Sequence, residues 1–107
     1  MTTSKSPAAA KPNDQVLRLK PQVDLVASTV EAQRDTMMKA LESGASAVVL
    51  DLDGVEQLDS LGITLVLGLF KTCQKAGTPF SIEGVKSDIM RVFRLFNLPK
   101  FFPILEG

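Results

Sequence analysis

Hydrophobic and polar residues follow two different spacings along this chain, and the changes of spacing predict its elements. Residues 16–20 alternate between apolar and polar, which predicts a strand that Pro21 ends. Residues 47–52 are almost continuously apolar, which predicts a central strand covered on both faces. Residues 80–83 predict another strand, and residues 101–104 predict either a last short strand or an apolar tail.

Three helices are predicted between and after these strands, at about residues 28–43, 60–76 and 87–96. Either Ser28 or Thr29 begins the first helix, Ser28 and Glu31 have the spacing of a capping box, and Gly44 ends the helix. Gly77 ends the second helix. Because strands and helices alternate with short turns between them, the pattern predicts a mostly parallel sheet with helices packed on it.

The first residues differ in composition from the rest of the chain. Residues 1–13 are mainly Ser, Thr, Pro, Ala and Lys, which predicts a disordered N-terminal tail. Residues 14–107 then form one domain of ordinary size. Since 45% of the chain is hydrophobic and the aromatic residues are all Phe, we expect a mostly aliphatic core.

Composition argues against several classes of function. The 12 basic and 12 acidic residues give no overall basic charge for binding nucleic acid. The chain has no His, and its one cysteine, Cys73, is expected to be a small buried thiol that forms no disulfide or zinc site. Asp51, Asp53 and Glu56 have no nucleophile–base pair beside them, so we expect no enzymatic activity and no cofactor or metal.

The chain also lacks the sequence signals of a membrane or secreted protein. It has no apolar run long enough to span a bilayer, and no apolar core of a secretory signal lies near Lys5 and Lys11. We therefore expect a cytoplasmic protein without direct membrane insertion. Its oligomeric state stays open.

The candidate functional segment is Asp59-Ser60-Leu61-Gly62, where a strand and its following loop meet a helix. A phosphate on Ser60 would add about −1.5 to −2 charges at pH 7. We expect it to meet unpaired backbone N–H groups and the positive end of the helix dipole. Either Ser60 or Asp59 is also a suitable N-cap of the helix, since both residue types prefer that position.

The helix that follows is apolar nearly all round, which is typical of a deeply buried helix or of an interface. One set of its residues is expected to cover the sheet: Leu61, Leu65, Gly68, Leu69 and Cys73. A second set points elsewhere, and we expect part of it to be exposed and to dock a partner: Ile63, Val66, Leu67 and Phe70.

These segments closely resemble the STAS family, which is shared by sulfate transporters and anti-sigma factor antagonists. The resemblance rests on the apolar strand at residues 48–52, the Asp59-Ser60-Leu61-Gly62 motif, the apolar helix, and residues 75–77 and 89–103. It covers residues 16–104. Within it, Asp24 takes the place of an acidic residue that the family commonly has in an early turn.

The resemblance implies an α/β fold, a small mixed, mostly parallel β-sheet with helices packed on one face. It implies a phosphorylation-switched protein-binding module of transcription regulation, an anti-sigma factor antagonist. When Ser60 is unphosphorylated, the module would sequester a partner that is both serine kinase and anti-sigma factor, and that holds ATP and Mg²⁺. Phosphorylation of Ser60 would release this partner, and a PP2C-type phosphatase would reset the switch.

Several alternatives stay open within this family. The segment expected to bind the partner comprises Asp59, Ser60, Leu61, Gly62, Ile63, Thr64, Val66 and Leu67. Within it, Gly62 either admits a partner backbone or is only a small residue, and Thr64 is a second contact, a second phosphosite or a plain surface threonine. The chain as a whole is alternatively a STAS accessory subunit of a membrane phospholipid ABC transporter, or a scaffold subunit of a stress-sensing assembly.

Overall fold

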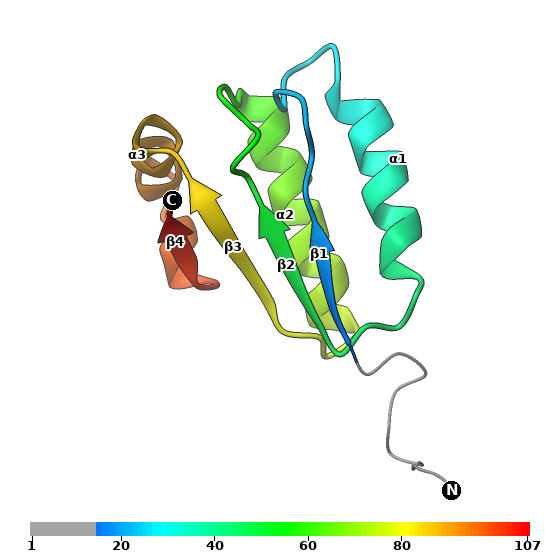
Figure 1. Ribbon diagram of the computed structural model, residues 1–107. Coiled ribbons are helices and arrows are strands. Elements are labelled where there is room, and N and C mark those ends of the chain that lie inside the picture. The colour runs from blue at the N-terminus through cyan, green and yellow to red at the C-terminus, as the bar shows by residue number, and fades with distance from the viewer. Residues whose placement is uncertain (1–14) are drawn as a thin grey trace, which may run out of the picture.

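Strands and helices alternate along the chain as the sequence pattern predicts. The computed structural model describes residues 15–107, so the predicted disordered tail at residues 1–13 lies outside the described residues. The described elements are β1 (Val16–Leu19), α1 (Val30–Leu41), β2 (Ala47–Asp51), α2 (Ser60–Lys75), β3 (Phe80–Val85), α3 (Ser87–Leu95), the 3₁₀ turn η1 (Leu98–Lys100) and β4 (Ile104–Glu106) (Figure 1).

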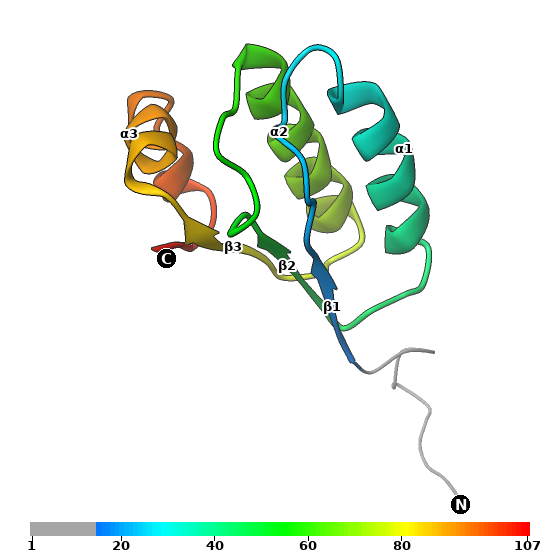
Figure 2. The ribbon, with the colours of Figure 1, turned by 45° about the horizontal axis from the view of Figure 1, so that its top comes forward.

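The four strands form one sheet in the order β1-β2-β3-β4, and each neighbouring pair is parallel. Each helix connects a strand to its next neighbour in the same direction, and such crossovers are almost always right-handed. All helices therefore lie on one side of the sheet, as Figure 2 shows for α1, α2 and α3. The predicted α/β fold with helices on one face is confirmed.

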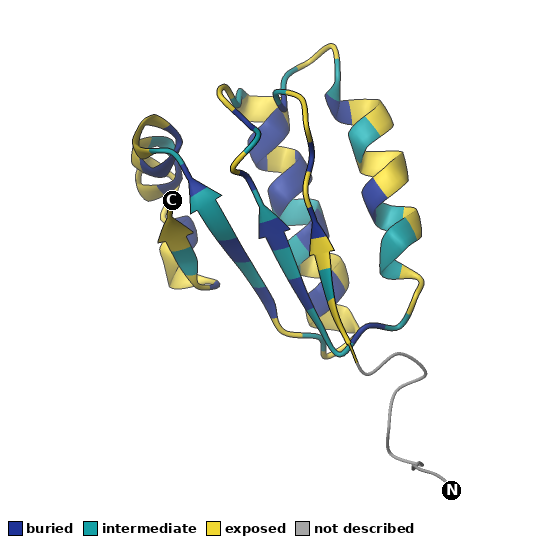
Figure 3. Ribbon diagram, in the orientation of Figure 1, coloured by how far each residue is buried: buried dark blue, intermediate teal, exposed yellow. Residues whose placement is uncertain are grey.

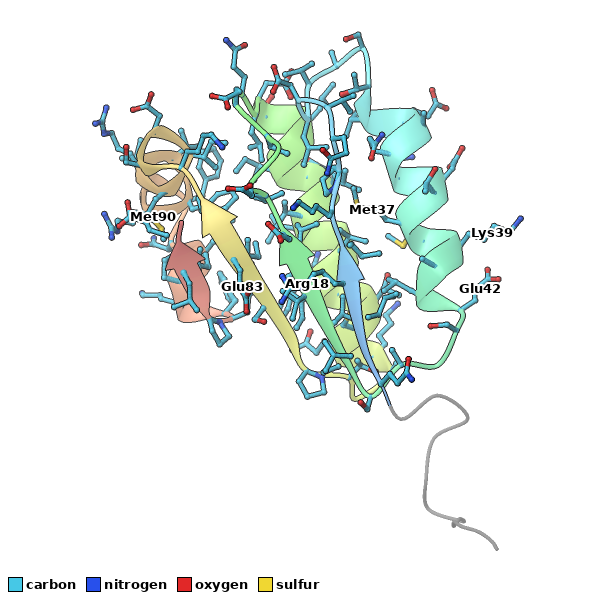
Figure 4. The ribbon with its side chains drawn as sticks, viewed as in Figure 1. Arg18, Met37, Lys39, Glu42, Glu83 and Met90 are labelled. Atoms are coloured by element: carbon cyan, nitrogen blue, oxygen red, sulfur yellow. The ribbon has the colours of Figure 1, made fainter. Side chains whose placement is uncertain are left out.

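The opposite face of the sheet is open among the described residues, so the expectation that β2 is covered on both faces is wrong. Val48 and Leu50 are buried toward the helices, whereas the residues that alternate with them along β2 are only half-buried (Figure 3). On the open face, Arg18 contacts Asp51 (3.1 Å) and Glu83 (3.2 Å), the carboxylates of the two next strands (Figure 4).

The ends of the helices differ in part from their prediction. Ser28 and Glu31 form no capping box, because Thr29 is the N-cap of α1. The Thr29 hydroxyl instead accepts from the Val26 N–H and donates to the Asp24 carbonyl, so it closes the turn before the helix. The other changes are small: α3 ends at Leu95, and the last strand lies slightly later in the chain than predicted.

Candidate functional site

Asp59 organises the amino end of α2. Its backbone is extended and its Oδ1 accepts from the N–H groups of Leu61 (2.9 Å) and Gly62 (3.1 Å), so Asp59 is the N-cap. Its Oδ2 accepts from the N–H of Ala27 (2.9 Å), in the segment before α1. One carboxylate therefore caps the helix and also ties it to a chain segment 32 residues earlier. Of the two candidate caps, Asp59 fills the role and Ser60 does not.

Ser60 is the first residue of α2 and is exposed. Its carbonyl accepts from the Thr64 hydroxyl (3.1 Å), which lies one turn further along the helix and is also exposed. The Ser60 hydroxyl makes no hydrogen bond to any residue that the structure describes. It is thus available at the surface, whereas the Thr64 hydroxyl is bonded to its own helix.

The expectation that a phosphate on Ser60 would meet unpaired N–H groups is wrong for the N–H groups of Leu61, Gly62 and Ile63. Asp59 Oδ1 accepts from the first two, and the Asp59 carbonyl accepts from the third (3.0 Å). A phosphate at Ser60 would therefore project outward beside a carboxylate. Its main effect would be on the charge of this surface, because these three N–H groups already have acceptors.

Gly62 is buried against the segment before α1 and does not offer its backbone to a partner. A Cβ at this position would lie 2.4 Å from the Leu25 carbonyl oxygen and 2.7 Å from Leu58 Cγ. The same segment pairs with the loop before α2, since the Leu25 N–H donates to the Gln57 carbonyl (3.1 Å) and the Asp59 N–H donates to the Leu25 carbonyl (3.2 Å). Gly62 therefore permits this close packing inside the domain.

The two predicted sets of α2 residues are not divided as expected. Ile63 and Val66 are buried in the core, so the expectation that they form part of an exposed docking surface is wrong for both. Leu61, expected to cover the sheet, is 46% exposed beside Ser60. α2 is packed against both the sheet and α1, so its buried surface extends farther round the helix than the sheet-facing set. Leu67 remains half-buried.

Sequence reasoning missed that a second segment of chain forms part of the surface around Ser60. Asp24 Oδ1 accepts from the N–H groups of Glu56 (2.8 Å) and Gln57 (3.1 Å), which holds residues 23–27 against the loop before α2. Val23 and Ala27 are exposed on that segment. An Asp in a polar turn is a sequence signal for such a clamp, but its partners lie 32 and 33 residues away.

The remaining candidate groups are structural. Asp51 pairs with Arg18, and Lys86 contacts Glu56 (3.5 Å). Within residues 15–107 there is no group of three or more His, Cys, Asp or Glu residues placed to hold a metal ion. Cys73 is buried as expected, and burial raises the pKa of its thiol.

None of the helices in the described part of the chain is both long and apolar enough to cross a bilayer.

The chain matches a family model and is similar to several known proteins. Residues 7–106 match the family model of the STAS domain. The protein MlaB of Escherichia coli (strain K12), named as a binding protein of an intermembrane phospholipid transport system, is 29% identical over 80 residues, which are 71% of this chain and 82% of MlaB. MlaB of Shigella flexneri matches with the same identity and coverage.

Two solved structures share the fold. A candidate anti-sigma factor antagonist of Thermotoga maritima superposes with a TM-score of 0.80 at 22% identity, covering 86% of this chain and 80% of its own. A sulfate transporter family protein of Wolinella succinogenes superposes with a TM-score of 0.69 at 15% identity, covering 86% and 77%. With the match to the family model extending over nearly its whole length, the chain belongs to the STAS domain family.

Proposed function

We propose that this chain is a phosphorylation-switched protein-binding module of the anti-sigma factor antagonist type, and that Ser60 is its phosphorylation site. The observation that carries the proposal is that Asp59, and not Ser60, caps α2. Because Asp59 caps α2, the exposed Ser60 hydroxyl is not needed to hold the helix and can accept a phosphate without unfolding it. The fold shared with a candidate anti-sigma factor antagonist supports this assignment.

The contact surface of the unphosphorylated module comprises the exposed residues around that hydroxyl. Leu61 supplies an apolar contact, Thr64 lies one helical turn away, and Val23 and Ala27 come from the neighbouring segment. A phosphate of about −1.5 to −2 charges at the centre of this contact would have to be desolvated beside Asp59. Each 1.4 kcal/mol lost in this way weakens binding about tenfold, so a few kcal/mol release the partner.

In this proposal the chain itself has no catalytic activity. The partner is a serine kinase that also acts as an anti-sigma factor, and it supplies ATP and Mg²⁺ for phosphate transfer to Ser60. A PP2C-type phosphatase removes the phosphate and restores binding. The absence of His from the chain fits a substrate of these enzymes better than an enzyme.

The test is affinity capture from a lysate of the source cell with the wild type, Ser60→Ala and Ser60→Asp, followed by identification and quantification of the retained proteins. We expect a serine kinase to be retained by the wild type and Ser60→Ala and lost with Ser60→Asp. All three proteins should have the same unfolding temperature, because Ser60 is exposed and surface substitutions usually change stability by less than about 0.5 kcal/mol. Equal retention of the kinase by Ser60→Asp would refute the switch.

A second candidate function has a separate observation in its favour. MlaB, which is named for an intermembrane phospholipid transport system, is more similar in sequence to this chain (29%) than the Thermotoga maritima antagonist is (22%). In this alternative the same surface docks constitutively on a subunit of a transport complex, and Ser60 is an ordinary contact residue. Capture of transporter subunits in equal amounts by the wild type and Ser60→Asp would favour it over the switch.

A further inference from the structure

A groove between α2 and the C-terminal part of the chain is separate from the surface around Ser60. It has a volume of about 240 Å³ and is lined by Leu67, Phe70, Lys71, Phe96, Leu98 and Phe101. At about 30 Å³ per liquid water, this is the space of roughly eight waters, so a large apolar side chain can enter it. The lining residues come from α2 and from the segment between the end of α3 and Phe101.

The floor and one wall of the groove are firmly packed. The ring of Phe70 lies 6.1 Å from that of Phe101 and 5.0 Å from that of Phe102, and Phe102 meets Phe80 edge to face at 5.1 Å. Leu98 is buried beneath them. Such a cluster holds its shape without a ligand, which lowers the entropy cost of binding.

The rim of the groove is unusually apolar for a surface. Two residues of its lining, Phe96 and Phe101, are 51% and 55% exposed, and Leu95, next to Phe96 in sequence, is 76% exposed. These three side chains lie within seven residues of one another in sequence, where α3 passes into η1. Large apolar residues that gather at the surface mark contact sites for other molecules.

The one charged residue in the groove lining is Lys71, and the segments that supply the lining are basic although the whole chain is neutral. α2 and residues 89–105 together contain no acidic residue, and their basic residues are Lys71, Lys75, Arg91, Arg94 and Lys100. Arg91 contacts Asp88 at 4.0 Å, and the other four form no ion pair with any residue in the described part of the chain. The segments that line the groove therefore carry an excess of basic residues, with Lys71 in the lining itself.

We propose that this groove binds an amphipathic helix of a partner protein, one that inserts large apolar side chains and carries Asp or Glu on its flanks. The apolar lining would bind the large apolar side chains of the partner helix, and the basic residues would attract its Asp and Glu residues. A second copy of this chain docked groove to groove is disfavoured, because the two basic linings would meet. A concave groove also fits a helix better than the flat surface of a bilayer.

This site is independent of the proposed switch. Leu67 and Lys71 lie 7 and 11 residues after Ser60 on the same helix, which at about 1.5 Å per residue is roughly 10–17 Å along its axis. A bound helix about 10–12 Å wide that crosses α2 at these residues would leave the Ser60 surface free. The domain could hold one partner in the groove while phosphorylation controls another.

The test uses a displayed library of random peptides about 16 residues long, roughly four helical turns, selected against the whole chain. We expect enriched peptides with apolar residues at i, i+3, i+4 and i+7 and acidic residues beside them. Synthetic copies should bind Lys71→Glu and Phe96→Ser at least tenfold more weakly than the wild type. They should bind Ser60→Asp and two matched controls, Lys39→Glu on α1 and Val23→Ser in the segment before α1, as the wild type does; Lys39 is labelled in Figure 4.

Circular dichroism of each variant first establishes that it is folded. Enrichment of basic or unpatterned peptides, or equal binding by Lys71→Glu and Phe96→Ser, would overturn the proposal. Two further measurements address other occupants: sedimentation with vesicles of equal parts phosphatidylcholine and phosphatidylglycerol, and sedimentation equilibrium of the protein alone. Vesicle binding or self-association that these two groove variants abolish would also overturn it.

Discussion

Two glycines of α2 should respond in opposite directions to the same substitution. In a helix interior, Gly→Ala normally stabilises by about 0.5–1 kcal/mol, because alanine loses less backbone entropy on folding. Gly68→Ala should show this gain, since its new Cβ would meet only the end of the Met38 side chain at 3.7 Å. Gly62→Ala instead places its Cβ 2.4 Å from the Leu25 carbonyl oxygen.

The contact at Gly62 cannot be relieved by a side-chain rotation. The Leu25 carbonyl accepts from the Asp59 N–H (3.2 Å), so moving it would strain the hydrogen bonds that join its segment to the amino end of α2. A backbone contact this short should cost about 2–3 kcal/mol, the upper part of the range for overpacking, and subtracting a helix-propensity gain of about 1 kcal/mol leaves a net loss of about 1–2 kcal/mol. In a domain of this size, that loss lowers the unfolding temperature by about 4–16 °C.

The assay is thermal unfolding of the wild type, Gly62→Ala and Gly68→Ala, followed by circular dichroism at one protein concentration. Gly68→Ala should unfold at a higher temperature than the wild type and Gly62→Ala at a lower one. If Gly62→Ala were as stable as the wild type, the close approach of Leu25 would not constrain the fold, and the account of Gly62 as a packing residue would be wrong.

Three further substitutions test the fold around the site and the open sheet. Asp59→Ala should lower the free energy of unfolding in urea by about 1–3 kcal/mol, because three N–H groups lose a charged acceptor. Burial raises the pKa of the Cys73 thiol, so above the ordinary thiol value of about 8.5 the thiol of the unfolded chain is deprotonated before that of the folded chain. The free energy of unfolding should therefore fall as the pH rises from 8 to 10, and it should fall less steeply in Cys73→Ala. Arg18→Gln should destabilise more at low than at high salt, because it leaves the paired neighbours Asp51 and Glu83 as facing like charges; a loss independent of salt would contradict this.

Local pattern was enough to predict the order of elements and the position of the Ser60 motif. It could not decide between Asp59 and Ser60 as the cap, since both residue types suit that position. The backbone decides it: Asp59 is extended, and its carboxylate also reaches the Ala27 N–H, a contact 32 residues away that no local rule anticipates.

The sequence of a helix likewise does not determine which neighbouring element covers each of its faces. α2 is apolar on most sides, and this pattern is the same whether a partner or α1 covers the second face. The structure places Ile63 and Val66 in the core and leaves Leu61 exposed. The net charge of zero was misleading for a similar reason, because it conceals that α2 and residues 89–105 carry basic residues and no acidic ones.

The construction of the Ser60 surface bears on how a phosphate there could act. Asp59 joins α2 to the Ala27 segment, and Asp24 joins that same segment to the loop before α2. Because the N–H groups of Leu61 and Gly62 are already bonded to the Asp59 carboxylate, a phosphate does not gain these two donors to pull the chain into another shape. A signal at Ser60 would therefore be carried by charge at an unchanged surface, and only a partner that covers this position would sense it. A partner in the groove along α2 would not.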